Sequence, residues 1–253
     1  MILLTHEQRQ RLERVMDRAR RDRAYFAKVF FGLDLSPKQV QALELGGRVQ
    51  VKVAGRRFGK STITLVDVVH QLVTHRRHVW YVTAPSIDQA KIYFTELEQR
   101  AGQNPLLARL LKGPIKWSPF PEATFITGSQ LLGRSTARDG VYLRGKGANG
   151  VAITEAAFVK DKVYQDVIRA MVLDRKGSLR LETTPNGMNY VYTLYQQGLE
   201  DPTGYYRSFH ATIYDNPRID PDDIERTRRE VPELVWRTEF LAEFVEDNTA
   251  GFP

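Results

Sequence analysis

One segment restricts the possible folds of this 253-residue chain more than any other. Valines alternate at positions 49, 51 and 53, which is the pattern of a short strand. The strand leads into the loop Ala54-Gly55-Arg56-Arg57-Phe58-Gly59-Lys60-Ser61-Thr62. A strand, a glycine-bearing turn and a helix start together direct backbone N–H groups and the helix dipole at one point. The segment therefore predicts a phosphate-binding loop.

The residue types in this loop indicate which phosphates it would bind. Lys60 can reach the β- and γ-phosphates of a nucleoside triphosphate, and the Ser61 hydroxyl can complete the shell of a bridging Mg²⁺. Ala54 stands where the G-x-x-x-x-G-K-[ST] pattern has its first glycine, so the loop is a variant. The alternative is an ordinary strand-to-helix turn with an incidental lysine.

From residue 49 onward, short β-branched runs alternate with helical runs, which predicts an α/β fold with a mainly parallel sheet flanked by helices. Strands are expected at residues 49–53, 78–83, 151–154 and 179–184, and helices at residues 63–73, 88–100, 162–172 and 188–197. Residues 115–117, 123–127 and 130–134 predict a small antiparallel β insertion. Helix starts are expected at Thr5, through a capping box with Gln8, and at Asp220 before Pro221.

A carboxylate follows the third of these strands. The run Val151-Ala152-Ile153-Thr154 ends at Glu155, which fits a Walker B strand with Glu155 as the general base for an attacking water. The position before it, normally an aspartate that supports Mg²⁺, holds a neutral threonine, Thr154, which could act only through a metal-bound water. Glu182, on the next strand, is a carboxylate that could substitute. The alternative is a core strand followed by an exposed glutamate.

Composition limits the remaining possibilities. Lys and Arg total 37 against 30 Asp and Glu, and the resulting charge of +7 favours a polyanionic partner. Cysteine is absent, so disulfides, thiolate metal sites and cysteine nucleophiles are excluded. No apolar run approaches the ~18 residues of a membrane span, and we expect a soluble, intracellular protein.

Several motifs together resemble the ATPase domain of the large terminase subunit of tailed bacteriophages, a P-loop NTPase of the ASCE/RecA-like type. They are Ala54 to Ser61, Leu143-Arg144-Gly145, Ile153 to Ala157, Thr183-Thr184-Pro185-Asn186-Gly187 and Arg237 to Phe244. The resemblance runs from about Ser36 to Phe244. It implies a motor that hydrolyses Mg²⁺-ATP and packages DNA into empty capsids.

The resemblance also implies roles for individual residues. Gln41 would contact adenine, and Arg56 would be the arginine inside the phosphate loop. Arg144 occupies the position of an arginine finger that reaches into a neighbouring subunit, although a structural salt bridge is the alternative. Thr183, Thr184 and Pro185 match the motif that couples hydrolysis to movement.

The expected organisation follows the family. Residues 1–35 would form an N-terminal helical lid or appendage, residues 36–245 the ATPase domain, and residues 246–253 the start of a linker to a C-terminal nuclease domain. The chain should then hydrolyse ATP and grip DNA without cutting it. Because translocation requires a sequence-independent grip on phosphates, basic residues are needed, and Arg100, Arg109 and Lys112 are candidates.

The implied partners are double-stranded DNA, a portal protein, the small terminase subunit and further copies of the chain in a ring, often a pentamer. The implied location is the cytoplasm of an infected bacterium. The isolated domain is expected to be a monomer.

Two other functions stay open. One is a helicase-like DNA translocase, which would usually have a second RecA-like half. The other is a nucleotide-gated DNA-binding module that hydrolyses ATP weakly, which is motivated by Thr154.

Overall fold

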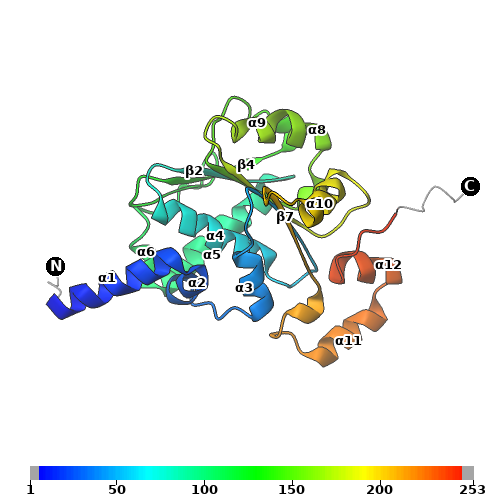
Figure 1. Cartoon of the computed structure of the whole chain (residues 1–253), viewed down its shortest axis with the longest axis horizontal. Coiled ribbons are helices and arrows are strands. Elements are labelled where there is room, and N and C mark those ends of the chain that lie inside the picture. The colour runs from blue at the N-terminus through cyan, green and yellow to red at the C-terminus, as the bar shows by residue number, and fades with distance from the viewer. Residues whose placement is uncertain (1–5, 247–253) are drawn as a thin grey trace, which may run out of the picture.

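The computed structural model of the protein describes residues 6–246. Its centre is a seven-stranded sheet in the order β3-β4-β2-β5-β6-β1-β7, and every neighbouring pair is parallel except β3 with β4 (Figure 1). The strands are β1 (Val49–Ala54), β2 (Val79–Ala84), β3 (Glu122–Thr124), β4 (Gln130–Ser135), β5 (Gly150–Thr154), β6 (Ser178–Thr183) and β7 (Tyr206–Ala211).

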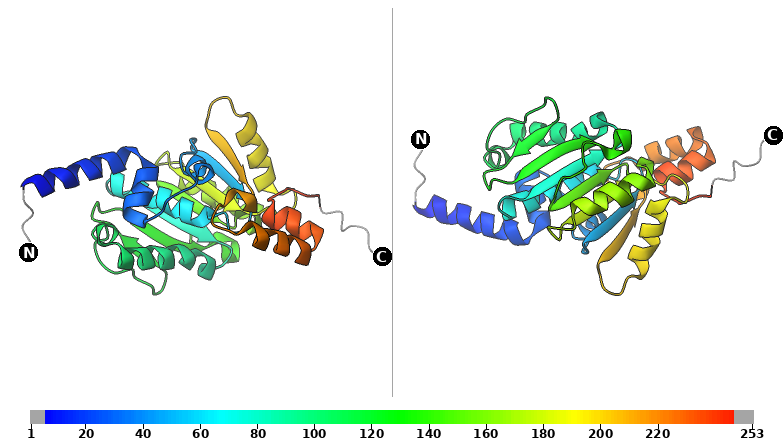
Figure 2. Two further views of the ribbon diagram at one scale, coloured as in Figure 1. Left: turned by 90° about the horizontal axis from the view of Figure 1, so that it is seen from below. Right: turned by 90° about the horizontal axis from the view of Figure 1, so that it is seen from above.

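Helices cover both faces of the sheet (Figure 2). One face packs against α2 (Arg23–Phe31), α3 (Pro37–Leu43), α4 (Lys60–Thr74) and α5 (Ile87–Gln103). The other packs against α8 (Asp161–Val163), the π-helical turn η2 (Tyr164–Ile168), α9 (Arg169–Met171) and α10 (Tyr190–Glu200). Because side chains alternate along a strand, Val51 and Val53 face the second layer while Lys52 faces the first.

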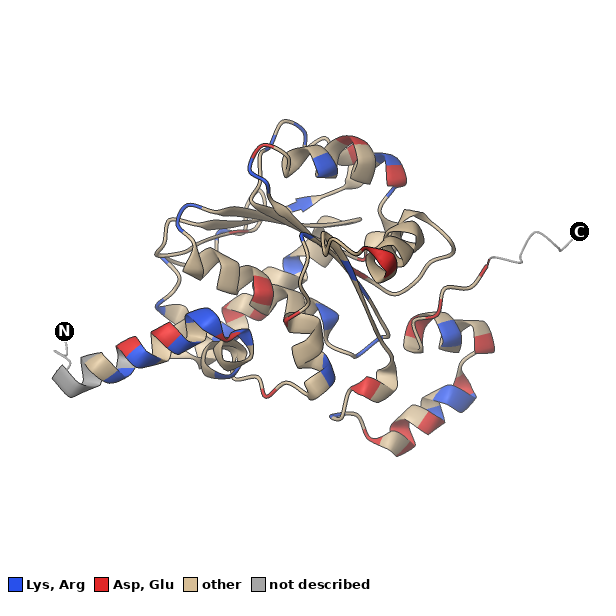
Figure 3. Cartoon of the chain, in the orientation of Figure 1, with Lys and Arg blue, Asp and Glu red and all other residues tan. Residues whose placement is uncertain are grey.

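The remaining elements lie at the ends of the chain and around the sheet. The helix α1 (His6–Arg21) projects from the body and carries many of the charged residues (Figure 3). The phenylalanines of α2, by contrast, belong to the core that contains α4. The others are α6 (Pro105–Ala108), α7 (Ala137–Gly140), η1 (Ala156–Phe158), η3 (Ile213–Asp215), α11 (Pro221–Glu230), α12 (Glu233–Val235) and η4 (Trp236–Phe240). Within residues 6–246, no helix is both long and apolar enough to cross a membrane.

The α/β fold, the four expected strands and the parallel pairing are confirmed. Asp220 caps α11, with Pro221 in its first turn. Thr5, the expected cap of the first helix, lies outside the described residues. The helix expected at 162–172 is present but changes to π-helical geometry at its centre, over Tyr164–Ile168.

The expected insertion differs in two respects. Residues 130–135 do pair antiparallel with β3, but they also pair in parallel with β2, so they extend the central sheet. This is possible because β4 is buried on both faces, as an internal strand must be. Residues 115–117 form no strand; only the bridge between Lys116 and Glu122 remains.

The sequence did not reveal β7, which pairs along the whole length of β1. Its sequence, Tyr206-Arg-Ser-Phe-His-Ala211, mixes polar and apolar residues because the strand lies at the sheet edge and only Phe209 and Ala211 are buried. Edge strands have a weak alternation signal for this reason. The strand matters for the site because it supports the side of β1 where the phosphate loop begins.

Candidate nucleotide-binding site

The loop between β1 and α4 has the backbone of a phosphate cradle. Arg57 and Gly59 adopt left-handed conformations, with φ of 65° and 96°, and α4 starts at Lys60. The buried side chain of Phe58 anchors the loop, and the Phe58 carbonyl accepts a hydrogen bond from Gln39 Nε2 at 2.9 Å. Ala54 is the last residue of β1 and is paired with Ala211, so this position is extended and does not require glycine.

Glycine is required at the next position instead. A Cβ atom on Gly55 would lie 2.1 Å from the carbonyl oxygen of Phe240, since η4 packs directly against the loop. The Arg56 N–H donates to the Glu239 carbonyl at 2.7 Å, and Arg56 Nε lies 2.8 Å from Glu239 Oε2. The C-terminal motif therefore forms one wall of the site.

A cavity of about 290 Å³ opens beside the loop, and we call it the P-loop cavity. Its lining comes from five separate parts of the chain and includes four of the expected site residues, Arg56, Lys60, Glu155 and Thr184. The other lining residues are Gln89, Phe158 and Glu239. The cation Lys60 and the carboxylate Glu155 thus face one space. That arrangement can hold a phosphate chain next to a proton acceptor.

Glu155 follows β5 in a left-handed conformation, with φ of 50°. Such a backbone costs free energy for a residue other than glycine, and it commonly occurs at functional sites. Burial raises the pKa of Glu155; Lys60 lowers it, while Glu182 and Glu239 raise it further. A carboxylate with a raised pKa is a better base toward water.

The end of β6 is tied to the segment that follows Glu155. Thr183 Oγ1 donates to the Thr184 carbonyl at 2.6 Å and accepts from the Ala157 N–H at 3.2 Å. Thr183, Thr184 and Pro185 are all buried, and Thr184 lines the P-loop cavity. The loop after β6 is thus hydrogen-bonded to the segment that follows Glu155.

A second, smaller cavity of about 110 Å³ also borders the loop and is lined by residues that include Gln39, Phe58, Gly59, Asn216 and Arg218. Gln39 is also the third residue of a capping box with Ser36. Gln41, which was expected to contact adenine, lies on the exposed side of α3. The glutamine that contacts the loop is Gln39, two positions earlier.

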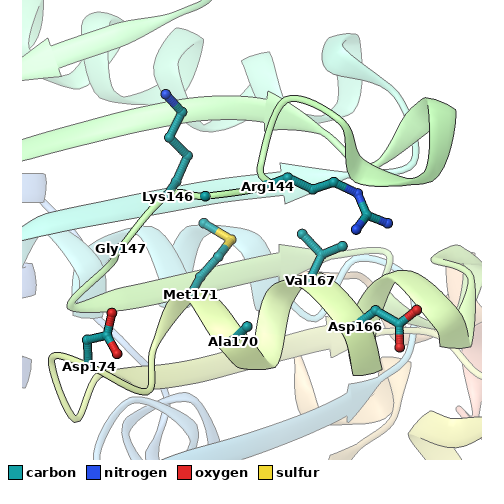
Figure 4. A pocket seen from close by; sticks show the side chains of 9 residues that line it. Arg144, Lys146, Gly147, Asp166, Val167, Ala170, Met171 and Asp174 are labelled. Carbon is teal, nitrogen blue, oxygen red and sulfur yellow. The ribbon is translucent and has the colours of Figure 1, made fainter.

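Arg144 lies apart from the P-loop cavity. It is exposed, and among residues 6–246 it forms no ion pair, so the structure offers no support for a salt bridge. It lines a separate cavity of about 280 Å³, the Arg144 groove, together with Lys146, Asp166, Val167, Met171 and other residues (Figure 4). Figure 4 shows Arg144 on the loop above η2 and α9, with Asp166 and Asp174 on the opposite side.

The residues around the phosphate loop are better suited to a metal ion that binds together with a nucleotide than to a permanently bound metal ion. No group of three or more His, Asp or Glu residues that could hold a metal ion occurs within the described part of the chain. Ser61, at the start of α4, and Thr154, at the end of β5, offer only hydroxyl oxygens. Mg²⁺ retains several waters and takes phosphate oxygens readily, so such a donor set is compatible with Mg²⁺-nucleotide.

The basic candidates for contacts with DNA differ from one another. Arg100 Nε forms an ion pair with Glu96 Oε1 at 2.9 Å, and Arg100 Nη1 donates a hydrogen bond to the Phe31 carbonyl at 2.7 Å. Arg109 and Lys112 are exposed and form no ion pair within residues 6–246. Only the latter two are free to meet a phosphate.

The fold and the loop define a P-loop NTPase domain. The family described as "Terminase large subunit, T4likevirus-type, N-terminal" matches residues 52–253, and the chain belongs to this family. The terminase large subunit of Thermus phage G20c is 26% identical over 259 residues, covering 89% of this chain and 52% of the relative. That of Escherichia phage T5 is 40% identical over 73 residues, covering 28% of this chain and 17% of the relative. The chain thus spans about half the length of the first relative.

Solved structures show the same fold at lower identity. The large terminase ATPase domain of Thermus phage P74-26 has a TM-score of 0.69 at 24% identity and covers 86% of this chain and 97% of that one. The HK97 bacteriophage large terminase has a TM-score of 0.71 at 15% identity, covering 89% and 55%. A large terminase from a thermophilic bacteriophage has been solved with ADP and with ATP-γ-S, with TM-scores of 0.66 and 0.63.

Proposed function

We propose that this chain is the ATPase motor domain of a viral terminase, which couples hydrolysis of Mg²⁺-ATP to translocation of double-stranded DNA into a procapsid. The observation that carries the proposal is the P-loop cavity, where Lys60, Glu155 and Thr184 meet at the end of the phosphate loop. Membership of the terminase family supports it. So do the ADP and ATP-γ-S complexes of the large terminase from a thermophilic bacteriophage.

The proposed reaction assigns each residue one task. Lys60 and the N–H groups at the start of α4 bind the β- and γ-phosphates. Glu155 accepts a proton from a water molecule while the oxygen of that water forms a bond to the γ-phosphorus. The bond between the γ-phosphorus and the oxygen that bridges to the β-phosphate breaks, which releases ADP and phosphate. Mg²⁺, held by Ser61 and through water by Thr154, would neutralise phosphate charge when bound.

The proposal also covers a neighbouring subunit, the coupling of hydrolysis to movement, and the assembly. Arg144 would stabilise the transferring phosphoryl group in the site of a neighbouring copy, because it lies outside its own P-loop cavity and has no ion pair within residues 6–246. The bonds between Thr183, Thr184 and Ala157 would pass the change at Glu155 to the loop after β6. A ring of five copies on a portal protein, loaded with DNA by the small terminase subunit in the host cytoplasm, is the proposed assembly.

DNA would be gripped through its phosphates by exposed basic residues, including Arg109 and Lys112. The helicase-like alternative would place a second RecA-like half beside the first; residues 6–246 hold one central sheet. The nucleotide-gated module differs from the motor in turnover, since it would bind ATP and release little phosphate.

Two substitutions test the proposed function. Glu155→Gln should lower phosphate release by about 10²-fold or more while ATP binding persists, because only the proton acceptor is lost. Lys60→Ala should weaken ATP binding itself. Glu44→Gln, at an exposed glutamate outside the site, is the matched control and should change neither quantity. Unchanged turnover in Glu155→Gln would show that Glu155 is not the base, and unchanged ATP binding in Lys60→Ala would remove the phosphate-loop assignment.

A further inference from the structure

Three residues form a row across the centre of the sheet, directly below the phosphate loop. Lys52 on β1 is paired with Glu182 on β6, and Glu182 is paired with Thr154 on β5. Side chains of paired residues in parallel strands point to the same face, which here is the face covered by α4 and α5. Glu182 therefore lies beside the Walker B position, where Thr154 provides no charge.

The carboxylate of Glu182 is fully buried and only half satisfied. Its Oε1 atom accepts a hydrogen bond from the Tyr93 hydroxyl at 2.6 Å, and Oε2 has no hydrogen-bond partner among the described residues. Burying an unpaired carboxylate oxygen is costly, so such an atom in a native fold calls for a further partner. The open oxygen belongs to a side chain with zero solvent exposure.

A buried cation accompanies this carboxylate. Lys52 Nζ is likewise buried without a hydrogen-bond partner among the described residues. Burial lowers the pKa of Lys52 to about 8, and the nearby carboxylates of Asp67 and Glu182 oppose that shift. Lys52 thus provides a basic group next to Glu182 in the same layer.

The other carboxylate in this layer is already committed. Asp67 on α4 lies 2.7 Å from Arg180 and 3.3 Å from Arg23. Burial raises the pKa of Asp67, but Arg180, Lys52 and Arg23 together outweigh that effect and hold it at about 2. Asp67 Oδ1, like Glu182 Oε2, has no hydrogen-bond partner among the described residues, but it faces the Arg23 guanidinium, whereas Glu182 Oε2 has no ion pair there. Glu182 is also paired across the sheet with Thr154, the residue directly before Glu155.

We propose that Glu182 supplies, from the neighbouring strand, the carboxylate that the Walker B strand lacks at Thr154. Glu182 acts as a positioning residue: its free oxygen orients the water shell of the nucleotide-bound Mg²⁺, while Tyr93 fixes the other oxygen and Lys52 balances the charge. The inference rests on the proposed function. In this chain the hydroxyl of Thr154 lies on β5 and the carboxylate of Glu182 lies on β6, at the same level of the sheet.

The test measures metal binding directly, by electron paramagnetic resonance of Mn²⁺ titrated into the complex of the chain with ADP. Glu182→Gln should weaken Mn²⁺ binding by on the order of tenfold, as expected for a residue that acts through metal-bound water, with ADP affinity in EDTA unchanged. Adding Thr154→Asp to Glu182→Gln should restore the lost affinity, because the charge returns one strand away. Circular dichroism confirms that each variant is folded.

A second variant decides the question even if Glu182→Gln does not fold. Thr154→Asp alone should change Mn²⁺ affinity by less than about twofold, because the site already has its carboxylate. A gain of about tenfold in this variant would show that the site lacked one, and would overturn the proposal. Unchanged Mn²⁺ affinity in a folded Glu182→Gln would also overturn it.

The outcomes separate this inference from the proposed function. If the unmodified chain binds no ADP or ATP with or without metal, the proposed function fails. If it binds Mg²⁺-nucleotide and Glu182→Gln binds Mn²⁺ as tightly, only the role of Glu182 fails. Asp67→Asn, which removes the committed carboxylate of the same layer, is the control: it should lower thermal stability and leave Mn²⁺ affinity unchanged in the folded fraction.

Discussion

The P-loop cavity and the Arg144 groove differ in whether their charged residues have partners within the same chain. The P-loop cavity is lined by residues of the phosphate loop, α4, α5, η1, η4 and the segments that follow β5 and β6, and it brings charged residues of both signs together. The Arg144 groove holds an exposed arginine that forms no ion pair within residues 6–246. The proposed function accounts for this contrast: binding and proton transfer would take place within one subunit, while Arg144 would act in the site of another.

The largest expected effect is that of a substitution in the Arg144 groove. Arg144→Ala should lower turnover by about 10³-fold, since arginine fingers are worth ~10³ to 10⁵ in rate, with ATP affinity unchanged because Arg144 does not line the P-loop cavity. Phosphate release and nucleotide titration measure the two quantities. Lys146→Ala, on the same loop, is the control and should keep full activity; equal activity in both variants would make Arg144 dispensable.

The next effect concerns the wall of the P-loop cavity. Gly55→Ala places a methyl group 2.1 Å from the Phe240 carbonyl, so η4 or the loop must move. We expect a loss of about 1 to 3 kcal/mol in the free energy of unfolding, together with weaker ATP binding, in urea unfolding and nucleotide titration. At Gly113 a Cβ would meet nothing within 4 Å, so Gly113→Ala is the matched control. Normal ATP affinity in Gly55→Ala would show that η4 is not needed at the loop.

A smaller effect is expected at the ion pair on that wall. The Arg56 side chain is 62% exposed, so its bond to Glu239 is screened by solvent. Glu239→Gln should change the free energy of unfolding by less than about 1 kcal/mol. A loss of several kcal/mol in urea unfolding would show that the pair, rather than the backbone contact at Gly55, holds η4 in place.

The smallest expected effect is a shift in the pH dependence of turnover. Burial raises the pKa of Glu155, and a base must be deprotonated to work. Turnover should therefore fall as pH decreases through a midpoint above the ordinary glutamate pKa of about 4.3, with no loss at neutral pH. A pH profile of phosphate release on folded protein checks this. A midpoint at or below the ordinary value would contradict the assignment of Glu155 as a buried base.

The sequence predicted the elements whose signals are local. The loop at 54–61 and the strand before Glu155 could be identified because strand, turn and helix signals are contiguous there. Gln39 and Glu239 could not be assigned roles, because their contacts with the loop arise from α3 and η4 folding back onto it. Ser36 and Gln39 form a capping box in the structure, and no sequence signal shows that the side chain of Gln39 also contacts the loop.

Long-range pairing explains the remaining differences. The strand β7 joins β1 across more than 150 residues and has only two buried side chains, so periodicity did not identify it. The strand β4 appeared to belong to an insertion because its neighbour in sequence is antiparallel, while its parallel partner β2 is some 50 residues away. The row of Lys52, Glu182 and Thr154 likewise depends on strand order, which sequence alone leaves open.

The most direct test of an active site shared between two copies is a mixing experiment. Glu155→Gln retains Arg144 but lacks its own base, and Arg144→Ala retains Glu155 but lacks the finger. Mixed in the presence of DNA, at concentrations where wild-type turnover rises more steeply than protein concentration, the two should release phosphate well above the sum of their separate rates. A mixture whose rate equals that sum would show that Arg144 does not complete a neighbouring site.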